Sequence, residues 1–245
     1  MTSISVSKDA FLGGRVRAYQ PRSGYRAGVD AVILAAACPA KANETVLELG
    51  CGVGVAAMCL SARTGALVTG VEMQSDYAEL ALKNGVNVVE ADLNALPAAL
   101  RQCQFHHVIF NPPYLDPARG AAAADAGRQI ARAEATPLSA WFEVAMKRLR
   151  PKGCLTMIHR AERLPEILRL LPAGIGGAEV LPLQPRKGRS AHLVLLRGRK
   201  DTRAPFRLHA PKPIHAAAQH EADRPDYTSE FKGILQDGAP LAFPD

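Results

Sequence analysis

The chain has 245 residues, of which 48% are hydrophobic, and this content is ample for a substantial buried core. Lys and Arg number 30 against 23 Asp and Glu, and the formal net charge of +7 favours a polyanionic partner such as nucleic acid. The first nine residues lack the basic start and apolar stretch of a secretion signal, and no run of about 18 apolar residues occurs. These features exclude a disordered chain and predict a soluble, cytoplasmic protein.

The cysteines and histidines give no sign of a disulfide or a metal site. The cysteines are Cys38, Cys51, Cys59, Cys103 and Cys154. They are odd in number, form no Cys-x-x-Cys pair and mostly lie in apolar runs, so we expect reduced thiols in the core. His106 and His107 lie on an expected buried strand without further ligand residues nearby, and we predict no metal.

The N-terminal segment differs from the rest in its mixture of arginine, aromatic residues and glycine. Within residues 1–27, Gly13-Gly14 and Pro21 interrupt regular structure. We interpret this segment as a basic arm that covers the core without belonging to it. A helix is expected over residues 31–38, with the carboxylate of Asp30 as its N-cap.

From residue 44 onward, apolar runs alternate with helix-forming stretches. The runs predict strands at 45–49, 67–71, 86–90, 105–110 and 154–158, and the stretches between them predict helices at 55–63, 75–83, 93–100, 137–149 and 161–171. Strands that alternate with helices form a parallel sheet. Two more strands, at 179–183 and 190–196, are separated by six residues, too few for a parallel crossover, so we expect an antiparallel hairpin.

Two segments outside this pattern complete the chain. Residues 116–132 are rich in alanine and glycine and predict a loop that could act as a lid. Residues 201–245 form a polar, proline-rich tail. The helical spacing of Tyr227, Phe231, Ile234 and Leu235 indicates that part of the tail docks on the core. We expect a single domain of residues 1–245, with its catalytic core at residues 28–200.

Polar residues and glycines gather at the ends of the first three core strands. The turn Gly50-Cys51-Gly52-Val53-Gly54 precedes a helix, where glycine allows a ligand to approach the backbone and the helix start offers N–H groups. Glu72 ends the next strand, where a carboxylate can accept hydrogen bonds from both hydroxyls of a ribose, and Asp92 follows the third strand. This edge predicts a nucleoside site. NAD is disfavoured because Val55 replaces the Gly or Ala of the dinucleotide fingerprint, whereas S-adenosylmethionine has a ribose and no pyrophosphate.

The stretch Asn111-Pro112-Pro113-Tyr114 follows the fourth strand and combines an amide, free carbonyls and an aromatic ring. Prolines lack an N–H and force the preceding residue into an extended conformation, so the segment leaves the sheet as a stiff ribbon. The Asn111 side-chain oxygen and the Pro112 carbonyl could accept both hydrogens of one exocyclic amine while Tyr114 stacks on its ring. The plainer interpretation is a sharp turn after a strand.

Taken together and in this order, residues 46–54, Glu72, Asp92 and residues 111–114 resemble the class I S-adenosylmethionine-dependent methyltransferases that modify exocyclic amines. Three further segments resemble the bacterial valine-tRNA adenine N6-methyltransferases: residues 20–26 with Asp30, residues 131–134 and residues 158–164. Ala133 departs from this family, which has a histidine in its Ala-Arg-His-Glu segment.

The resemblance implies a Rossmann-like α/β fold with a seven-stranded, mostly parallel sheet, S-adenosylmethionine as cofactor and an adenosine N6 amine of tRNA as substrate. The cofactor residues it implies are Glu48, Gly50, Cys51, Gly52, Gly54, Glu72, Met73 and Asp92. The catalytic residues it implies are Asn111, Pro112 and Tyr114. Candidate RNA contacts are Arg26, Arg132, Arg186, Lys187 and Arg189, although the last three could equally form a solvated hairpin tip.

Three other functions remain open from the residues alone. A glutamine N5-methyltransferase acting on a protein would use the same amide clamp, but such proteins usually carry a helical N-terminal domain that twenty-seven residues cannot supply. The same clamp would suit another RNA amine, such as guanine N2 of rRNA. An inactive RNA-binding module is disfavoured by the intact Asn111 and Tyr114. The sequence predicts no oligomeric state.

Overall fold

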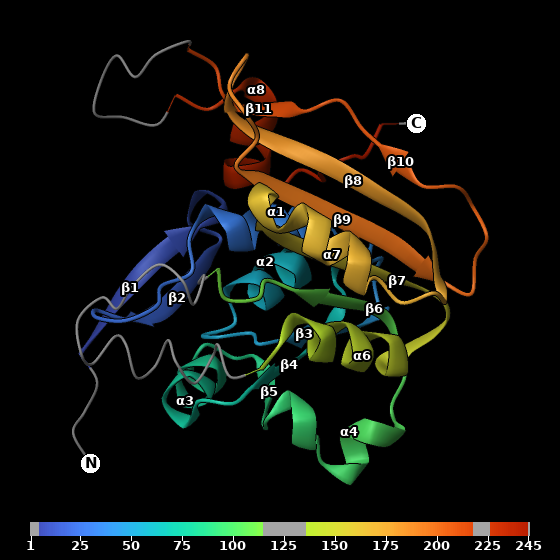
Figure 1. The fold of residues 1–245 in the computed structure, drawn as a ribbon. Helices are drawn as coiled ribbons and strands as arrows, with labels where there is room; N and C mark the ends of the chain where they lie inside the picture. The colour runs from blue at the N-terminus through green and yellow to red at the C-terminus, as the bar shows by residue number, and fades with distance from the viewer. Residues whose placement is uncertain (1–4, 115–135, 218–225, 245) are drawn as a thin grey trace.

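The computed structural model describes residues 5–114, 136–217 and 226–244 (Figure 1). The expected loop at 116–132, with Arg132 and Ala133, lies outside these residues. The chain begins with a two-stranded antiparallel sheet of β1 (Val6–Phe11) and β2 (Val16–Pro21), joined by a helical turn at Leu12–Gly14, and continues into α1 (Val29–Ala37).

Within the described residues, nine strands form the main sheet. They are β3 (Thr45–Leu49), β4 (Leu67–Glu72), β5 (Asn87–Glu90), β6 (Phe105–Phe110), β7 (Leu149–Arg160), β8 (Ile175–Arg186), β9 (Leu193–Lys200), β10 (Arg207–Leu208) and β11 (Lys212–His215). Their order is β10-β8-β9-β7-β6-β3-β4-β5, with β11 paired to β8.

The other helices in the described ranges are short to medium in length. They are α2 (Val55–Thr64), α3 (Ser75–Lys83), α4 (Ala98–Gln102), α6 (Leu138–Arg148), α7 (Leu164–Leu170) and α8 (Ser229–Lys232), with helical turns at Leu93–Ala95, Ala161–Arg163 and Gly233–Asp237. Within the described parts of the chain, no helix is both long and apolar enough to cross a membrane.

The pairing confirms the expected topology and changes the strand count. Strands β5, β4, β3, β6 and β7 are parallel neighbours, and β9 runs antiparallel to both β7 and β8, as the short connection between the last two expected strands predicts. In the part of the chain that the structure describes, the sheet has nine strands instead of seven, because β10 and β11 come from the expected polar tail. Strands of two and four residues show no recognisable alternation of polar and apolar residues.

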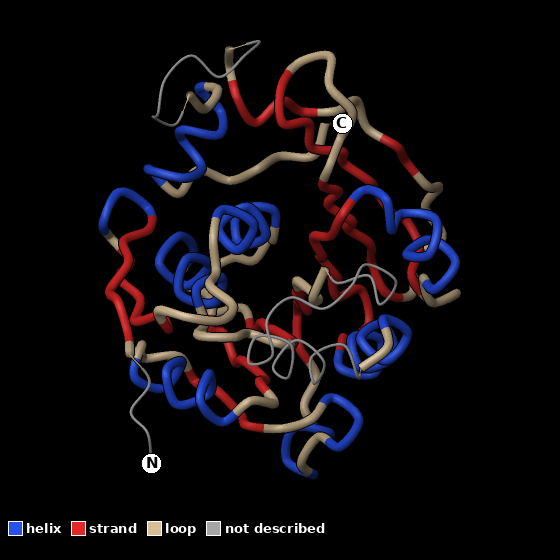
Figure 2. Tube along the Cα trace, turned by 60° about the vertical axis from the view of Figure 1, so that its left-hand side comes forward, coloured by secondary structure: helices blue, strands red, loops and turns tan. Residues whose placement is uncertain are grey.

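Both faces of the sheet are buried. Successive side chains of a strand point to opposite faces. Val46 packs into the cluster that contains α1 and α2, while Leu47 and Leu49 pack into the cluster that contains α6 and α7. The helices accordingly lie on both sides of the sheet (Figures 1 and 2). The continuous apolar runs in the sequence therefore reflect strands covered by helices on two sides.

The ends of the chain contribute to the first of these clusters. Leu12, Val16 and Ala18 of the N-terminal hairpin are buried there, so the expectation that the arm stays outside the core is wrong for these residues. From the tail, Phe231 and Ile234 are fully buried in the same cluster, which confirms the predicted docking. All five cysteines are free, and only Cys103 among them is exposed.

Candidate active site

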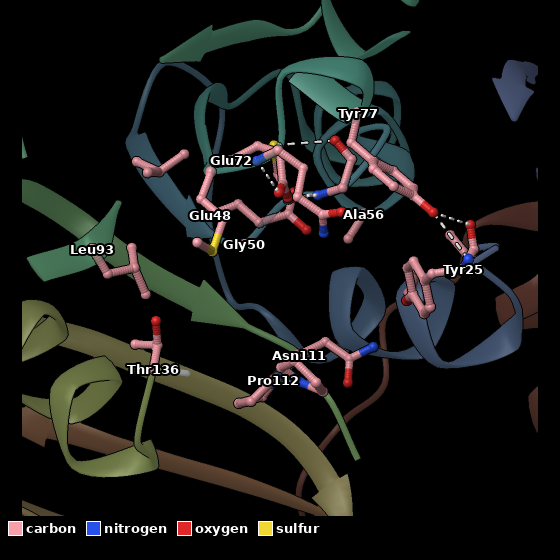
Figure 3. A pocket seen from close by; sticks show the side chains of 18 of the residues that line it. Tyr25, Glu48, Gly50, Ala56, Glu72, Tyr77, Leu93, Asn111, Pro112 and Thr136 are labelled. Carbon is pink, nitrogen blue, oxygen red and sulfur yellow. Dashed lines mark hydrogen bonds between the residues drawn. The ribbon is translucent and has the colours of Figure 1, made fainter. Parts of the chain in front are cut away.

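A cavity of about 440 Å³ opens at the carboxyl ends of β3, β4 and β6. Strand order reverses between β3 and β6, because the chain proceeds outward from β3 to β4 and β5 and then returns to place β6 on the other side of β3. Ligands of open α/β sheets bind at such a switch point. The residues predicted from the glycine turn and those predicted from the Asn-Pro-Pro-Tyr segment line this one cavity from opposite sides (Figure 3).

We call the first side the glycine-loop wall. Its residues are Glu48, Gly50, Cys51, Gly52, Glu72 and Met73. The backbone of Gly50, Gly52 and Gly54 has positive φ. A Cβ atom on Gly50 would lie 2.4 Å from Cη2 of Trp141, and one on Gly54 would lie 2.5 Å from Cγ2 of Val86. Glycine is therefore required both by conformation and by close packing. Gly54 supports the loop at the start of α2 without lining the cavity.

Glu72 ties this wall to the backbone. Its carboxylate is buried, with Oε2 accepting a hydrogen bond from the Gly52 N–H and Oε1 accepting one from the Gln74 N–H, each at 2.9 Å. Burial raises the pKa of Glu72, and the N–H donors of Gln74, Gly52 and Met73 oppose this rise. Since each carboxylate oxygen has a second lone pair, Glu72 can still accept from a vicinal diol such as that of a ribose.

Glu48 is the unsatisfied acid of the same wall. It is 4% exposed, and its Oε2 has no hydrogen-bond partner among the described residues. Burial raises its pKa to about 8, the Ala57 N–H opposes the rise and the charge of Glu72 adds to it. A buried carboxylate oxygen that faces a cavity without a donor suits a cationic group of a ligand.

Asp92 differs from the other predicted cofactor residues. It is exposed and does not line the cavity, although its neighbours Ala91 and Leu93 do. Its Oδ1 accepts from the Asn94 N–H at 2.8 Å and so caps the helical turn that follows. The structure thus places Asp92 at the rim.

The opposite side of the cavity is the Asn-Pro wall, formed by Asn111, Pro112, Pro113 and Tyr114 directly after β6. The Oδ1 atom of Asn111 is buried and has no hydrogen-bond partner in the described part of the chain. An unsatisfied buried acceptor costs free energy, about 1–3 kcal/mol, unless a ligand supplies the missing donor. In Figure 3, Asn111 and Pro112 lie across the cavity from Glu48 and Glu72.

Tyr114 is fixed by contacts on several sides. Its hydroxyl donates to Asp30 Oδ2 at 2.7 Å, its ring centroid lies 5.3 Å from that of His159, and the Arg160 guanidinium carbon lies 5.3 Å from the ring centroid. Burial and the charge of Asp30 raise the pKa of Tyr114. The expected N-cap role of Asp30 is wrong: Gly28 holds the N-cap position of α1, and the side chain of Asp30, in the first turn, reaches Tyr114.

Sequence reasoning missed two tyrosines of the cavity, Tyr25 and Tyr77. The hydroxyl of Tyr77 accepts from the Tyr25 N–H at 2.9 Å and donates to the Tyr25 carbonyl at 3.2 Å. Buried Gln20 holds the same loop by bonding both the N–H and the carbonyl of Ala27. The interleaved basic and aromatic residues of 20–26 indicate a functional segment, but the sequence favours an arm that covers the core over a wall of the cavity.

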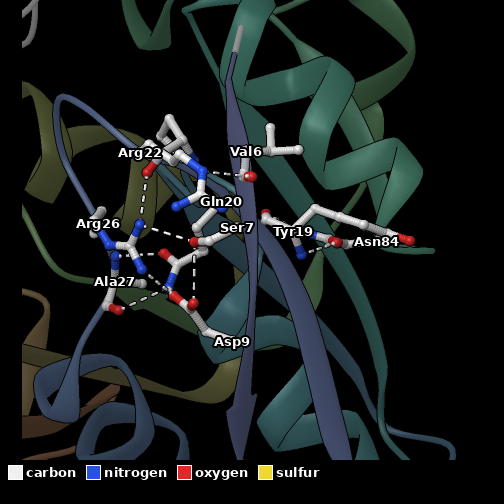
Figure 4. A network of polar contacts seen from close by, with 10 residues as sticks. Val6, Ser7, Asp9, Tyr19, Gln20, Arg22, Arg26, Ala27 and Asn84 are labelled. Carbon is white, nitrogen blue, oxygen red and sulfur yellow. Dashed lines mark hydrogen bonds and ion pairs between the residues drawn. The ribbon is translucent and has the colours of Figure 1, made fainter.

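Arg26, a predicted RNA contact, is used within the fold. Its guanidinium pairs with Asp9 and donates to the Ser7 hydroxyl and the Pro21 carbonyl, both at 2.9 Å (Figure 4). These contacts fasten the loop that carries Tyr25 to the N-terminal hairpin.

The residues of the predicted basic hairpin tip differ in their surroundings. Arg186 ends β8, where it donates to Asp226 Oδ2 at 2.5 Å and holds the pKa of Asp226 down to about 2. Lys187 and Arg189 are exposed. Because β7 and β8 both run antiparallel to β9, this tip and Arg160 lie at the same edge of the sheet as the cavity.

Comparison with known proteins agrees with this geometry. A family model described as a methyltransferase domain matches residues 46–133. A relative from Tolumonas auensis named tRNA1(Val) (adenine(37)-N6)-methyltransferase is 29% identical over 191 residues, which cover 72% of this chain and 77% of the relative. The protein of the same name from Shewanella baltica is 30% identical over 185 residues, covering 70% and 76%. A solved structure from Agrobacterium tumefaciens, described as a predicted O-methyltransferase, has a TM-score of 0.70 at 26% identity and covers 87% of this chain and 99% of its own.

The reversal of strand order beside β3, the antiparallel β9 and a glycine loop braced by Glu72 define a class I S-adenosylmethionine-dependent methyltransferase. The unsatisfied Glu48 and the bare backbone of the glycine loop fit this cofactor, which has a cationic amino acid end and a ribose. Within the class, the chain belongs to the tRNA1(Val) (adenine(37)-N6)-methyltransferase family. The expected fold class, enzyme class and cofactor are thereby confirmed.

Proposed function

We propose that this protein methylates the N6 amine of an adenosine in tRNA. The observation that carries the proposal is the buried, unsatisfied Oδ1 of Asn111 in the cavity that also holds the glycine-loop wall. An acceptor that lacks a donor is matched by a planar amine, and adenine presents one beside a ring that can stack. The two relatives above carry this activity in their names, at adenine 37 of tRNA1(Val).

The Asn-Pro wall would act by positioning. Asn111 Oδ1 and the Pro112 carbonyl each accept one hydrogen of the amine, and Tyr114 stacks on the extruded base. Extrusion costs a few kcal/mol, of which stacking returns ~1–3 kcal/mol. S-adenosylmethionine supplies an electrophilic methyl group. The residues of this wall fix the amine nitrogen in one orientation beside the cofactor cavity, which lowers the barrier without a strong base.

The glycine-loop wall would hold the cofactor. Glu72 accepts from the ribose hydroxyls while keeping its bonds to the Gly52 and Gln74 N–H groups. Glu48 faces the ammonium group, since its Oε2 is the orphaned acid of the cavity. Asp92 lies at the rim, and its Oδ1 is bonded to Asn94. Its Oδ2 would accept a hydrogen bond from the cofactor adenine only after the side chain turns toward the cavity. Cys51, Met73 and the glycines complete the apolar and backbone surface.

Two features favour an amine attached to an aromatic ring over other groups that could receive the methyl group. A hydroxyl carries one hydrogen, so the O-methylation in the description of the Agrobacterium structure would leave one acceptor of the wall unpaired. A glutamine amide has two hydrogens but no aromatic ring to stack on Tyr114. Adenine satisfies both acceptors and the ring.

The tRNA would bind along the edge that carries the cavity. Lys187, Arg189 and Arg160 lie there, and Lys and Arg contacts to phosphate position a nucleic acid without reading its sequence. Arg26 and Arg186 contribute indirectly, through the loop and tail they hold. We further propose that residues 1–245 act as one domain, in the cytoplasm where tRNA is processed.

The test uses separate reactions in which unmodified tRNA, rRNA or extracted cellular protein is incubated with the purified protein and S-adenosylmethionine carrying a labelled methyl group. Mass spectrometry of the nucleosides and of the digested protein then locates the label. The label should appear in N6-methyladenosine, and Asn111→Ala should give almost none. Label in N2-methylguanosine of rRNA or in a protein glutamine would replace the proposal with one of the alternatives, and binding without methylation of any substrate would leave only a binding module.

A further inference from the structure

The hydrogen bond between Tyr114 and Asp30 joins two parts of the fold that the sequence separates by 84 positions. Asp30 lies in the first turn of α1, on the N-terminal side of the core, and Tyr114 lies just after β6. At 2.7 Å, with the hydroxyl as donor and a carboxylate as acceptor, the bond is short and charge-assisted.

The hydroxyl has no part in stacking, so the bond needs another explanation. A base stacks on the ring face of Tyr114, for which phenylalanine would suffice. Among the described residues, the ring also packs against the apolar cluster that contains α1. It contacts His159 at an interplanar angle of 57°, and the Arg160 guanidinium lies over it. A tyrosine side chain has two rotatable bonds, χ1 and χ2. Anchoring the hydroxyl fixes χ1 and hence the place of the ring. The hydroxyl oxygen lies on the axis of χ2, so the bond to Asp30 restrains χ2 only through the preference of the O–H bond for the ring plane.

Asp30 carries no other role that would account for it. It does not cap α1, and it forms no ion pair with a described residue. A first-turn carboxylate gains a modest helix-dipole stabilisation wherever it points, as the exposed Asp76 does in the first turn of α3. The dipole alone does not direct the side chain of Asp30 toward Tyr114.

We infer that Asp30 is a positioning residue, which holds the Tyr114 ring in the orientation that the extruded base requires. The inference rests on the proposed function. It assigns the Tyr114 hydroxyl to Asp30 and the ring face to the substrate, so the two ends of one side chain serve different partners.

Steady-state methylation of tRNA tests this in a mutant cycle of Asp30→Ala, Tyr114→Phe and the double variant. Removing a charge-assisted hydrogen bond should lower kcat about 10-fold in either single variant, and the double variant should be no slower than the slower single one. Asp30→Asn should restore much of the rate, because its Oδ1 can still accept from the hydroxyl. Asp76→Ala, the matched removal of a first-turn carboxylate, should leave kcat and the unfolding temperature close to the parent values.

A second readout does not depend on methylation. In protein with ¹³Cζ-labelled tyrosine, the resonance that disappears in Tyr114→Phe belongs to Tyr114, and it should shift in Asp30→Ala and stay near its parent position in Asp76→Ala. An unshifted resonance would overturn the inference. So would additive losses in the double variant, which would give Asp30 a role independent of Tyr114.

The two proposals can fail separately. If Asn111→Ala abolishes tRNA methylation while Asp30→Ala retains the parent rate, the proposed function stands and the positioning role falls. If the parent methylates no tRNA, the proposed function falls, and the resonance still decides whether Asp30 holds the ring.

Discussion

The two walls of the cavity treat their polar atoms differently. On the glycine-loop wall, both oxygens of Glu72 already accept from backbone N–H groups, so the loop is braced before any ligand arrives. On the Asn-Pro wall, Asn111 Oδ1 has no donor among the described residues. The orphaned Oε2 of Glu48 also lies on the glycine-loop wall, where it suits a cationic end of the cofactor. The contrast between Glu72 and Asn111 therefore indicates that the glycine-loop wall serves cofactor binding, whereas Asn111 awaits a contact that only the reacting group completes. Variants of the two walls should therefore fail in different ways.

The largest expected effect is on the Asn-Pro wall. Asn111→Ala removes the acceptor that orients the amine, and turnover should fall ~100-fold or more with little change in tRNA or cofactor affinity. Single-turnover kinetics and calorimetry measure the two quantities. Asn87→Ala, which removes an exposed carboxamide bonded to Thr69, is the control and should behave as the parent. A parent-like rate in Asn111→Ala would remove the distinction between the walls.

On the glycine-loop wall the effect should appear in binding. Glu72→Ala removes a charge-assisted contact worth ~1.5–3 kcal/mol, so affinity for S-adenosylmethionine should fall about 10-fold or more. Glu90 is the matched control, since it pairs in register with Glu72 at the end of β5 and is exposed. Equal affinities of Glu72→Ala and Glu90→Ala in calorimetry would rule out the ribose contact.

Glu48 links this wall to pH. Its pKa in the folded protein is about 8, above the ordinary value of 4.5, so between these values the folded state keeps a proton that the unfolded state releases. Stability should therefore fall as pH rises through this window, by up to a few kcal/mol, and Glu48→Gln should abolish that fall. Thermal unfolding from about pH 5 to about pH 8 measures it, with Glu90→Gln as control.

The same acid should make cofactor binding depend on pH. A cationic ligand group favours the deprotonated form of Glu48, so affinity for S-adenosylmethionine should rise with pH over this window in the parent and change little in Glu48→Gln. A parent affinity that is constant with pH would show that no charge of the ligand faces Glu48.

The smallest expected effect is on tRNA binding and lies outside both walls, at the turn between β8 and β9. Lys187→Glu with Arg189→Glu should weaken tRNA binding and reduce the log–log salt slope by roughly 0.7 to 0.9 for each phosphate that the variant no longer neutralises. Turnover at saturating tRNA should not change. Filter binding over a range of salt concentrations measures the slope, and an unchanged slope would make these residues a solvated turn.

The sequence predicted the features that depend on local patterns and missed those that depend on long-range pairing. The glycine turn, Glu72 and the Asn-Pro-Pro-Tyr segment follow strands whose apolar runs are unmistakable, and parallel strands bring their carboxyl ends to one edge. Local patterns were therefore enough to place both walls.

Long-range pairing was beyond such patterns. Asp30 has the local features of an N-cap, yet its partner is Tyr114. Arg186 reads as part of a basic turn, yet Asp226, forty positions later, takes up its charge. Arg26 likewise binds Asp9. Arg186 and Arg26 suggest an external partner and Asp30 suggests a local cap, yet each side chain binds a residue distant in the sequence, which periodicity cannot reveal.

The uneven burial of the cysteines gives the protein a single natural attachment point. Burial raises the pKa of the thiols of Cys38, Cys51, Cys59 and Cys154, which suppresses the thiolate that reacts with alkylating dyes. Cys103 is exposed and follows α4 just before β6 begins, so it lies at the edge of the sheet away from the cavity. A maleimide fluorophore on the unmutated chain should therefore label one site and report tRNA association by anisotropy, with both walls left untouched.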